Sequence, residues 1–265
     1  MSITSTVVHR AETRFIEAAD VLRPYVGCFW VIAAERGATI RVVPDGSTAI
    51  SIQLQNNWSS GWCLRGPLIT PQERRFSSAA MLIGVRLRPG VAFLVSRIAG
   101  DAMLGRRVRL SGPAFHALVV KQPLSLTPAQ HVDVLQRFLI DRLENASLHP
   151  VVSCAIDAIQ RAQGCMPVAE IAAECGVSLR HLNRLMRRWL GYGPKCFARI
   201  VRFQETLKQI EHVPGRSGAA LASETGYFDQ AHLTMDMTRM AGATPRHLAS
   251  QCVADFYKTR CDGPL

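Results

Sequence analysis

A repeated pattern in the C-terminal part of the chain constrains its fold more than any other feature. A small residue stands four positions before a glycine twice, as Ala172 before Gly176 and as Ala222 before Gly226. The positions that follow also recur, first as Leu182, Met186, Gly191, Pro194 and Phe197 and then as Leu233, Met237, Gly242, Pro245 and Leu248. The offset is 50 residues before the turn and 51 after it. Such a repeat indicates one supersecondary unit that is built twice.

The first copy predicts two helices joined by a tight turn. A helix can end at Gly176, which tolerates positive φ, and Ser178 can cap the next helix by accepting a backbone N–H. In that second helix, apolar residues recur every three or four positions on one face: Leu182, Leu185, Met186, Trp189 and Leu190. The opposite face carries Arg180, His181, Asn183, Arg184, Arg187 and Arg188. A helix with one apolar and one cationic face suits the major groove of DNA.

These stretches resemble a known family. The run from Arg180 to Arg188, followed by Leu190 to Lys195, is similar to the first helix-turn-helix of AraC/XylS-type regulators. The stretches from Gly226 to Leu233 and from Gly242 to Leu248 are similar to the most recognisable part of that family. The resemblance implies a transcription regulator that binds double-stranded DNA through two helix-turn-helix units and has no catalytic activity.

The resemblance also implies a role for each residue on the two recognition helices. Arg180, Asn183 and Arg184 are expected to read bases, because arginine forks onto guanine and asparagine pairs with adenine. Gln230 holds the matching position on the second helix. Contacts to phosphates, which position the protein without specifying sequence, are expected from Arg187, Arg188, Lys195 and Arg239.

The second recognition helix is expected to contribute less than the first. Met235 stands where similar proteins often have an arginine, and Asp236 is expected to add a negative charge nearby. Both features weaken base readout and phosphate attraction.

Residues 20–110 are predicted to be rich in β-strands. Strands are expected at Tyr25 to Ile32, Thr48 to Leu54 and Met81 to Arg88, separated by Gly/Pro turns. Short strands in this arrangement suggest a small barrel or sandwich. The segments Val43–Gly46 and Gly84–Gly90 resemble the cupin-like sensor domain of the same family. We therefore expect an α+β protein: a cupin-like β-barrel with helices in an N-terminal sensor and dimerisation domain (1–145), followed by an all-α DNA-binding domain (151–255).

A helix is predicted after Thr127, with Val132, Leu135, Leu139 and Leu143 on one stripe. This stripe either packs on the barrel of its own chain or pairs with its copy in a homodimer formed through the N-terminal domain. Both alternatives are open at this point.

Several function classes are disfavoured by composition. No apolar run approaches the 18 residues of a membrane span, and the start has no secretory pattern, so a cytoplasmic protein is expected. The eight cysteines are scattered and are expected to be thiols. Residues 20–110 contain no histidine, which argues against a metal site, a cofactor and the alternative from another class, a cupin-type enzyme with a DNA-binding tail.

The effector is the open question. Residues 1–150 hold 17 Lys and Arg against 10 Asp and Glu, whereas residues 151–265 hold 14 against 10. The excess in the first part could contact the flanks of the DNA site or bind an anionic small molecule. Arg10 and Arg14 form an R-x-x-x-R motif that resembles the arginine motif of PilZ-type cyclic di-GMP receptors, and Asp45–Ser47 or Asn57–Ser59 could imitate their second motif.

Two alternatives compete with cyclic di-GMP. With 27 arginines, R-x-x-x-R matches arise by chance, so Arg10 and Arg14 can equally belong to a mobile basic N-terminus. The other alternative is an apolar or aromatic effector inside the barrel, lined by Phe29, Trp30 and Trp62.

Overall fold

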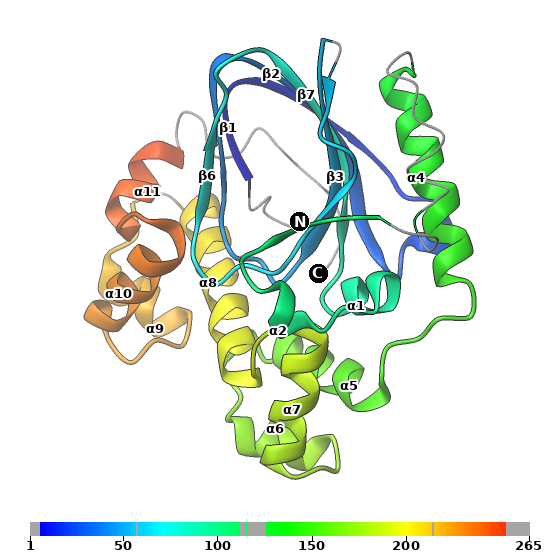
Figure 1. The fold of residues 1–265 in the computed structure, drawn as a ribbon. Helices are drawn as coiled ribbons and strands as arrows, with labels where there is room; N and C mark the ends of the chain where they lie inside the picture. Colours follow the sequence, from blue (N-terminus) through cyan, green and yellow to red (C-terminus); the bar gives the residue numbers. More distant parts are fainter. Residues whose placement is uncertain (1–5, 57, 112–114, 116–125, 214, 253–265) are drawn as a thin grey trace.

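The computed structural model describes residues 6–56, 58–111, 115, 126–213 and 215–252. Two parts are visible in Figure 1: a curled β-sheet with helices on one side, and a group of helices below and beside it. No helix among these residues is long and apolar enough to cross a membrane.

The N-terminal part is one antiparallel sheet of eight strands that curls without closing. Its strand order is β1 (Thr6–Ile16), β2 (Val26–Val42), β7 (Ala80–Leu87), β3 (Thr48–Gln55), β5 (Cys63–Arg65) and β8 (Arg107–Arg109). Two short strands extend it, β4 (Trp58–Ser59) on β3 and β6 (Gln72–Arg75) on β2. The α+β class is confirmed, and the expected barrel is an open, curled sheet.

Strand alternation divides the sheet into two faces. On β2, Phe29 is fully buried in the core that the sheet shares with its helices, whereas its neighbours Cys28 and Trp30 line the concave side. Helices α1 (Val91–Ser96) and α4 (Pro128–Leu143) complete that core, and α2 (Gly100–Met103) follows α1. Phe29 and Trp62 were expected to line a ligand cavity; this is wrong for both, because they belong to the helix-side core.

Helix α4 begins as predicted and packs on its own sheet. Thr127 accepts from the backbone N–H of Gln130, whose side chain in turn accepts from the backbone N–H of Thr127, a reciprocal cap. Its apolar stripe is buried against the sheet: Val132, Leu135, Leu139 and Leu143. That stripe therefore serves the chain's own core, and it is not the surface through which a second copy would bind.

The C-terminal part consists of seven helices among the described residues: α5 (Pro150–Arg161), α6 (Val168–Glu174), α7 (Leu179–Leu190), α8 (Pro194–His212), α9 (Gly218–Glu224), α10 (Gln230–Ala241) and α11 (Pro245–Cys252). Helix α8 runs between the group α5–α7 and the group α9–α11 (Figure 1). The proposed boundary between domains, at residues 145–151, stays a prediction.

The internal repeat is confirmed as two copies of one unit. Gly176 and Gly226 both have positive φ, 65° and 72°. The same hydrogen bond closes each turn, from Val177 N to the carbonyl of Ala172 (3.0 Å) and from Tyr227 N to that of Ala222 (2.9 Å). The recognition helices α7 and α10 are capped by Ser178 and Asp229, and both end at a left-handed glycine. Matching backbone geometry shows that the two copies fold for the same local reasons.

The two parts share a continuous contact through the loop of residues 43–47. Val43 is buried in the core of the C-terminal helices, and the carbonyl of Pro44 accepts from Gln204 Nε2 on α8 at 2.6 Å. A Cβ added to Gly46 would come within 2.7 Å of the Phe197 ring. Asp45, in the middle of this loop, turns the other way and pairs with Arg86 of β7. The loop thus joins the concave side of the sheet to α8.

Candidate nucleic-acid interface

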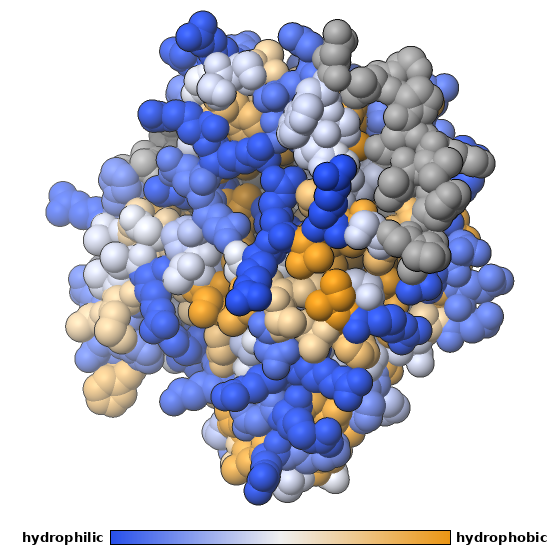
Figure 2. All heavy atoms as spheres, viewed as in Figure 1, coloured by the Kyte–Doolittle hydropathy of each residue, from blue (hydrophilic) through white to orange (hydrophobic). Residues whose placement is uncertain are grey.

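The first recognition helix, α7, presents a cationic face. Its apolar side is buried as predicted, whereas four arginines are exposed: Arg180, Arg184, Arg187 and Arg188. The surface over α7 is largely hydrophilic in Figure 2. Arg184 Nη2 donates to His181 Nδ1 at 3.2 Å, so these two side chains support each other within reach of a base edge.

Not every residue of this face is equally available. Asn183 is half-buried, and its Nδ2 donates to the carbonyl of Leu179 at 3.0 Å. The guanidinium of Arg188 lies 5.4 Å from the ring of Phe93 on α1, which is a cation–π contact. Both residues would have to change partners before they could contact DNA. Among the residues that the structure describes, Arg184 and Arg187 make no hydrogen bond, ion pair or cation–π contact with the N-terminal part.

The N-terminal part forms one wall of the groove that contains the reading face. Residues of α7 line it on one side, and Phe93, Arg97, Ala99 and Asp101 line it on the other. The start of α2 lies very close to the end of α7: a Cβ added to Gly100 would overlap the backbone nitrogen of Gly191. In addition, the rings of Phe93 and Trp189 are 4.6 Å apart. The first recognition helix is therefore held against α1 and α2 in this structure.

The second recognition helix has a more apolar and more open face. A shallow surface groove there is lined by residues of α10 only: Gln230, Ala231, Thr234, Met235, Thr238 and Arg239. Met235 of α10 is exposed, and so is Phe228 in the turn before this helix. Lys195 lies at the exposed start of α8. Gln230, the expected base reader, and Arg239, the expected phosphate contact, both line this groove.

The expected negative charge of Asp236 on that face is absent, and that expectation was wrong. Asp236 is 0% exposed and forms an ion pair with Arg199 of α8, with a second hydrogen bond from Arg199 Nε at 3.2 Å. The hydrogen bond to Asp236 raises the pKa of Arg199. The carboxylate therefore ties α10 to the connecting helix, where it cannot repel phosphates.

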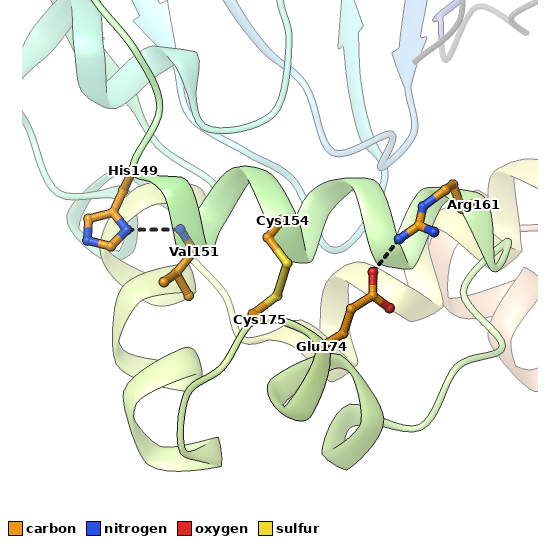
Figure 3. Close-up of a disulfide and its surroundings, with 6 residues drawn as sticks. All are labelled: His149, Val151, Cys154, Arg161, Glu174 and Cys175. Atoms are coloured by element: carbon orange, nitrogen blue, oxygen red, sulfur yellow. Dashed lines mark hydrogen bonds and ion pairs between the residues drawn. A yellow bond between two sulfur atoms is a disulfide. The ribbon is translucent and has the colours of Figure 1, made fainter.

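A disulfide links the first two helices of the DNA-binding part. Cys154 of α5 is bonded to Cys175, which follows α6, with the Cα atoms 5.9 Å apart (Figure 3). The expectation that the cysteines are thiols is therefore wrong for these two and for Cys28, which is also disulfide-bonded. An ion pair from Arg161 to Glu174 bridges the same helices. A disulfide that closes a loop of this size restricts the unfolded chain and so raises the free energy of unfolding by about 3 kcal/mol. Here it also fixes α6, the helix that precedes the turn into α7.

The predicted effector residues Arg10 and Arg14 are exposed on β1 and do not line the concave side. Arg10 sits where the pairing of β1 with β2 shifts register, has φ 55°, and lies against Gly37. Asp45 and Ser47 of the second suggested motif line the concave side instead, while Asn57 lies outside the described residues. The structure does not bring the two suggested motifs together.

The concave side holds four arginines that the sequence analysis did not single out: Arg65, Arg74, Arg86 and Arg107. Alternation within the strands is the signal that could have found them. Arg86 has the same parity as Leu82 on β7, and both line the cavity. The apolar residues on that face suggested an ordinary hydrophobic core, so the arginines among them were not recognised as lining a cavity.

Two families match parts of the chain. Residues 171–251 match a family described as "Helix-turn-helix domain", and residues 14–109 match one described as "Domain of unknown function (DUF6597)". A comparison with curated proteins finds no match.

Several solved structures are similar. A transcriptional regulator (AraC-type DNA-binding domain-containing proteins) from Chromobacterium violaceum is 21% identical over 40% of this chain and 94% of its own, with a TM-score of 0.37. A probable AraC family transcriptional regulator from Rhodopseudomonas palustris is 23% identical over 39% and 98%, with a TM-score of 0.36. ToxT from Vibrio cholerae O395 is 10% identical over 92% and 99%, with a TM-score of 0.45.

Two helix-turn-helix units on one connecting helix, the first with an exposed arginine face, define a DNA-binding protein. The matched family and the repeat geometry agree: residues 171–251 are a helix-turn-helix domain that contains two copies of the unit.

Proposed function

We propose that this regulator reads a specific operator with α7 and α10 and responds to a small effector held by its N-terminal part. The exposed arginine face of α7 carries the proposal, because its side chains combine hydrogen-bond donors for guanine with charge for phosphates. Arg180, Arg184 and Gln230 are the proposed base readers that are free to turn toward DNA, and Asn183 joins them once it leaves Leu179. The function places the protein in the cytoplasm, with its DNA.

Operator binding tests this proposal. Four cations are assigned to phosphates, Arg187, Arg188, Lys195 and Arg239, and each contact releases counterions. The logarithm of affinity should fall with the logarithm of salt concentration at a slope of about −3.6. That slope corresponds to a loss of about 150-fold between about 50 and 200 mM salt.

Fluorescence anisotropy with the protein's own upstream region, and with a shuffled duplex of equal length as the control, measures both quantities. Equal affinity for the two duplexes at every salt concentration would contradict sequence-specific readout.

Cyclic di-GMP, the effector suggested by Arg10 and Arg14, is a separate prediction that neither the comparisons nor the geometry supports. Both arginines are exposed on β1, away from the cavity. Titration calorimetry decides it: binding to the wild type that is lost in Arg10→Ala/Arg14→Ala would support it. Arg36→Ala, at an exposed position, is the matched control. Absence of heat with the wild type would remove these arginines from the effector question.

A homodimer is part of the proposal, and its surface lies elsewhere than the buried stripe of α4. Sedimentation of the full chain with and without operator DNA measures the stoichiometry.

A further inference from the structure

The concave side of the sheet contains a cavity with one apolar and one cationic wall. Its volume is about 160 Å³. The apolar wall is formed by Phe15, Trp30, Ile32, Ile40, Val42 and Leu82. An apolar cavity of about 150 Å³ in another protein holds a benzene ring, so a body of that size fits here. Cyclic di-GMP, with two guanine nucleosides, is much too large to be enclosed.

The shape of the apolar wall depends on Gly84. A Cβ added there would come within 2.5 Å of Trp30 Cζ2 and 2.6 Å of the Ile50 carbonyl. Glycine therefore leaves room for the six-membered ring of Trp30 to pack over β7, and Trp30 also lines the cavity. A flat aromatic surface of this kind favours a planar or ring-sized apolar body.

The cationic wall has more arginine than its acids can neutralise. Within the described part of the chain, the cavity is lined by four arginines, Arg65, Arg74, Arg86 and Arg107, and by two carboxylates, Asp45 and Glu73. Glu73 accepts from Arg41, with both donor atoms at 3.2 Å. Arg86 pairs with Asp45 at 2.7 Å, and Arg74 donates to Gln53.

Two arginines remain. Among the described residues, neither Arg65 nor Arg107 has a hydrogen-bond or ion-pair partner in direct contact. Burial lowers the pKa of Arg65, Asp45 raises it, and the neighbouring Arg107 and Arg86 lower it further. Arg65 and Arg107 face each other across β5 and β8, with Arg65 half-buried and Arg107 exposed. The two guanidinium groups repel each other, and an anionic ligand would neutralise that repulsion.

We propose that this cavity binds a small organic carboxylate with an apolar, ring-sized body. The carboxylate accepts from Arg65 and Arg107, and the body packs on Trp30 and Phe15. Two planar guanidinium groups match the two oxygens of a carboxylate, and the apolar wall excludes a fully hydrophilic anion such as a sugar phosphate. The inference rests on the proposed effector response and names its ligand class.

Thermal unfolding of the full chain tests the proposal with benzoate, phenylacetate and hexanoate, each beside its primary amide. At about 100 times Kd, a fitting carboxylate should raise Tm by about 5 °C. The amide of the same body should give little or no shift, because it cannot replace the charge. If no carboxylate raises Tm at about 10 mM, or if the amides raise it equally, the proposal is overturned.

Arg65→Ala separates a ligand-binding role from a structural one. We expect the ligand-free Tm to stay the same or to rise, since an unpaired cation is removed, and Kd for the carboxylate to weaken about 10- to 100-fold. Arg75→Ala, on the same strand as Arg74 but outside the cavity, should leave both values unchanged. A lower ligand-free Tm with an unchanged Kd would contradict the assignment of Arg65.

Operator binding by the wild type keeps the two proposals distinct. Sequence-specific DNA binding without any carboxylate response removes this inference alone. A carboxylate response that depends on Arg65, in a protein that binds all duplexes equally, removes the proposed operator function alone.

Discussion

Arg199→Ala is expected to lower the free energy of unfolding of the C-terminal part by about 3–5 kcal/mol, because it leaves a buried carboxylate without its partner. Asp236 is 0% exposed, and Arg199 is 27% exposed. His232 Nε2 lies 4.0 Å from the same carboxylate, too far to replace two guanidinium hydrogen bonds. The second helix-turn-helix unit should therefore lose its attachment to α8.

Urea unfolding followed by circular dichroism measures this loss. The double variant Arg199→Met/Asp236→Leu, which replaces the pair by apolar side chains of similar length, should recover most of the stability. Arg246→Ala, at an exposed position on α11, controls for the loss of one positive charge. A loss below about 1 kcal/mol in Arg199→Ala would contradict the assigned contribution of this ion pair.

Arg184→Ala should cost discrimination between bases, whereas Arg187→Ala should weaken binding to all duplexes alike. A bidentate contact to a base contributes about 1–3 kcal/mol of discrimination against the wrong base. A phosphate contact carries no sequence information, and its removal should reduce the salt slope by about 1. The two residues lie one turn apart on α7 and are both exposed, so each variant is the matched control of the other.

The measurement is anisotropy on the operator and on single-base variants of it. Arg184→Ala should flatten the differences at one base position. Uniform losses in both variants would mean that the assignment of reader and phosphate contact is wrong.

The sequence was most informative where a local rule decides the structure. Gly176 and Gly226 had to adopt positive φ, and Ser178 had to cap α7, because chain geometry alone requires it. Asp236 shows the limit of such rules. Because Asp236 follows Met235 directly, its charge was expected near the reading face. The structure instead pairs it with Arg199, which lies 37 residues away in the sequence and on another helix. The disulfide was missed for a similar reason, since 21 residues separate Cys154 from Cys175.

The candidate sites differ in the same way. The cationic face of α7 could be derived from the period of one helix. The four arginines of the cavity come from four strands, β5, β6, β7 and β8, and only the curl of the sheet brings them together. Alternation predicts which residues share a face, but the sequence did not reveal that this face encloses a cavity.

The loop of residues 43–47 has a thermodynamic consequence. Asp45 pairs with Arg86 inside the cavity, while its neighbours Pro44 and Gly46 contact α8. A carboxylate bound at Arg65 would compete with Asp45, which attracts the same guanidinium group, and would change the hold of this loop on α8, the helix between the two DNA-binding units. Linkage makes any such effect reciprocal: if the ligand alters operator affinity by some factor, the operator alters ligand affinity by the same factor. Operators of different sequence that require different positions of α8 would then give the bound regulator different affinities for the same ligand.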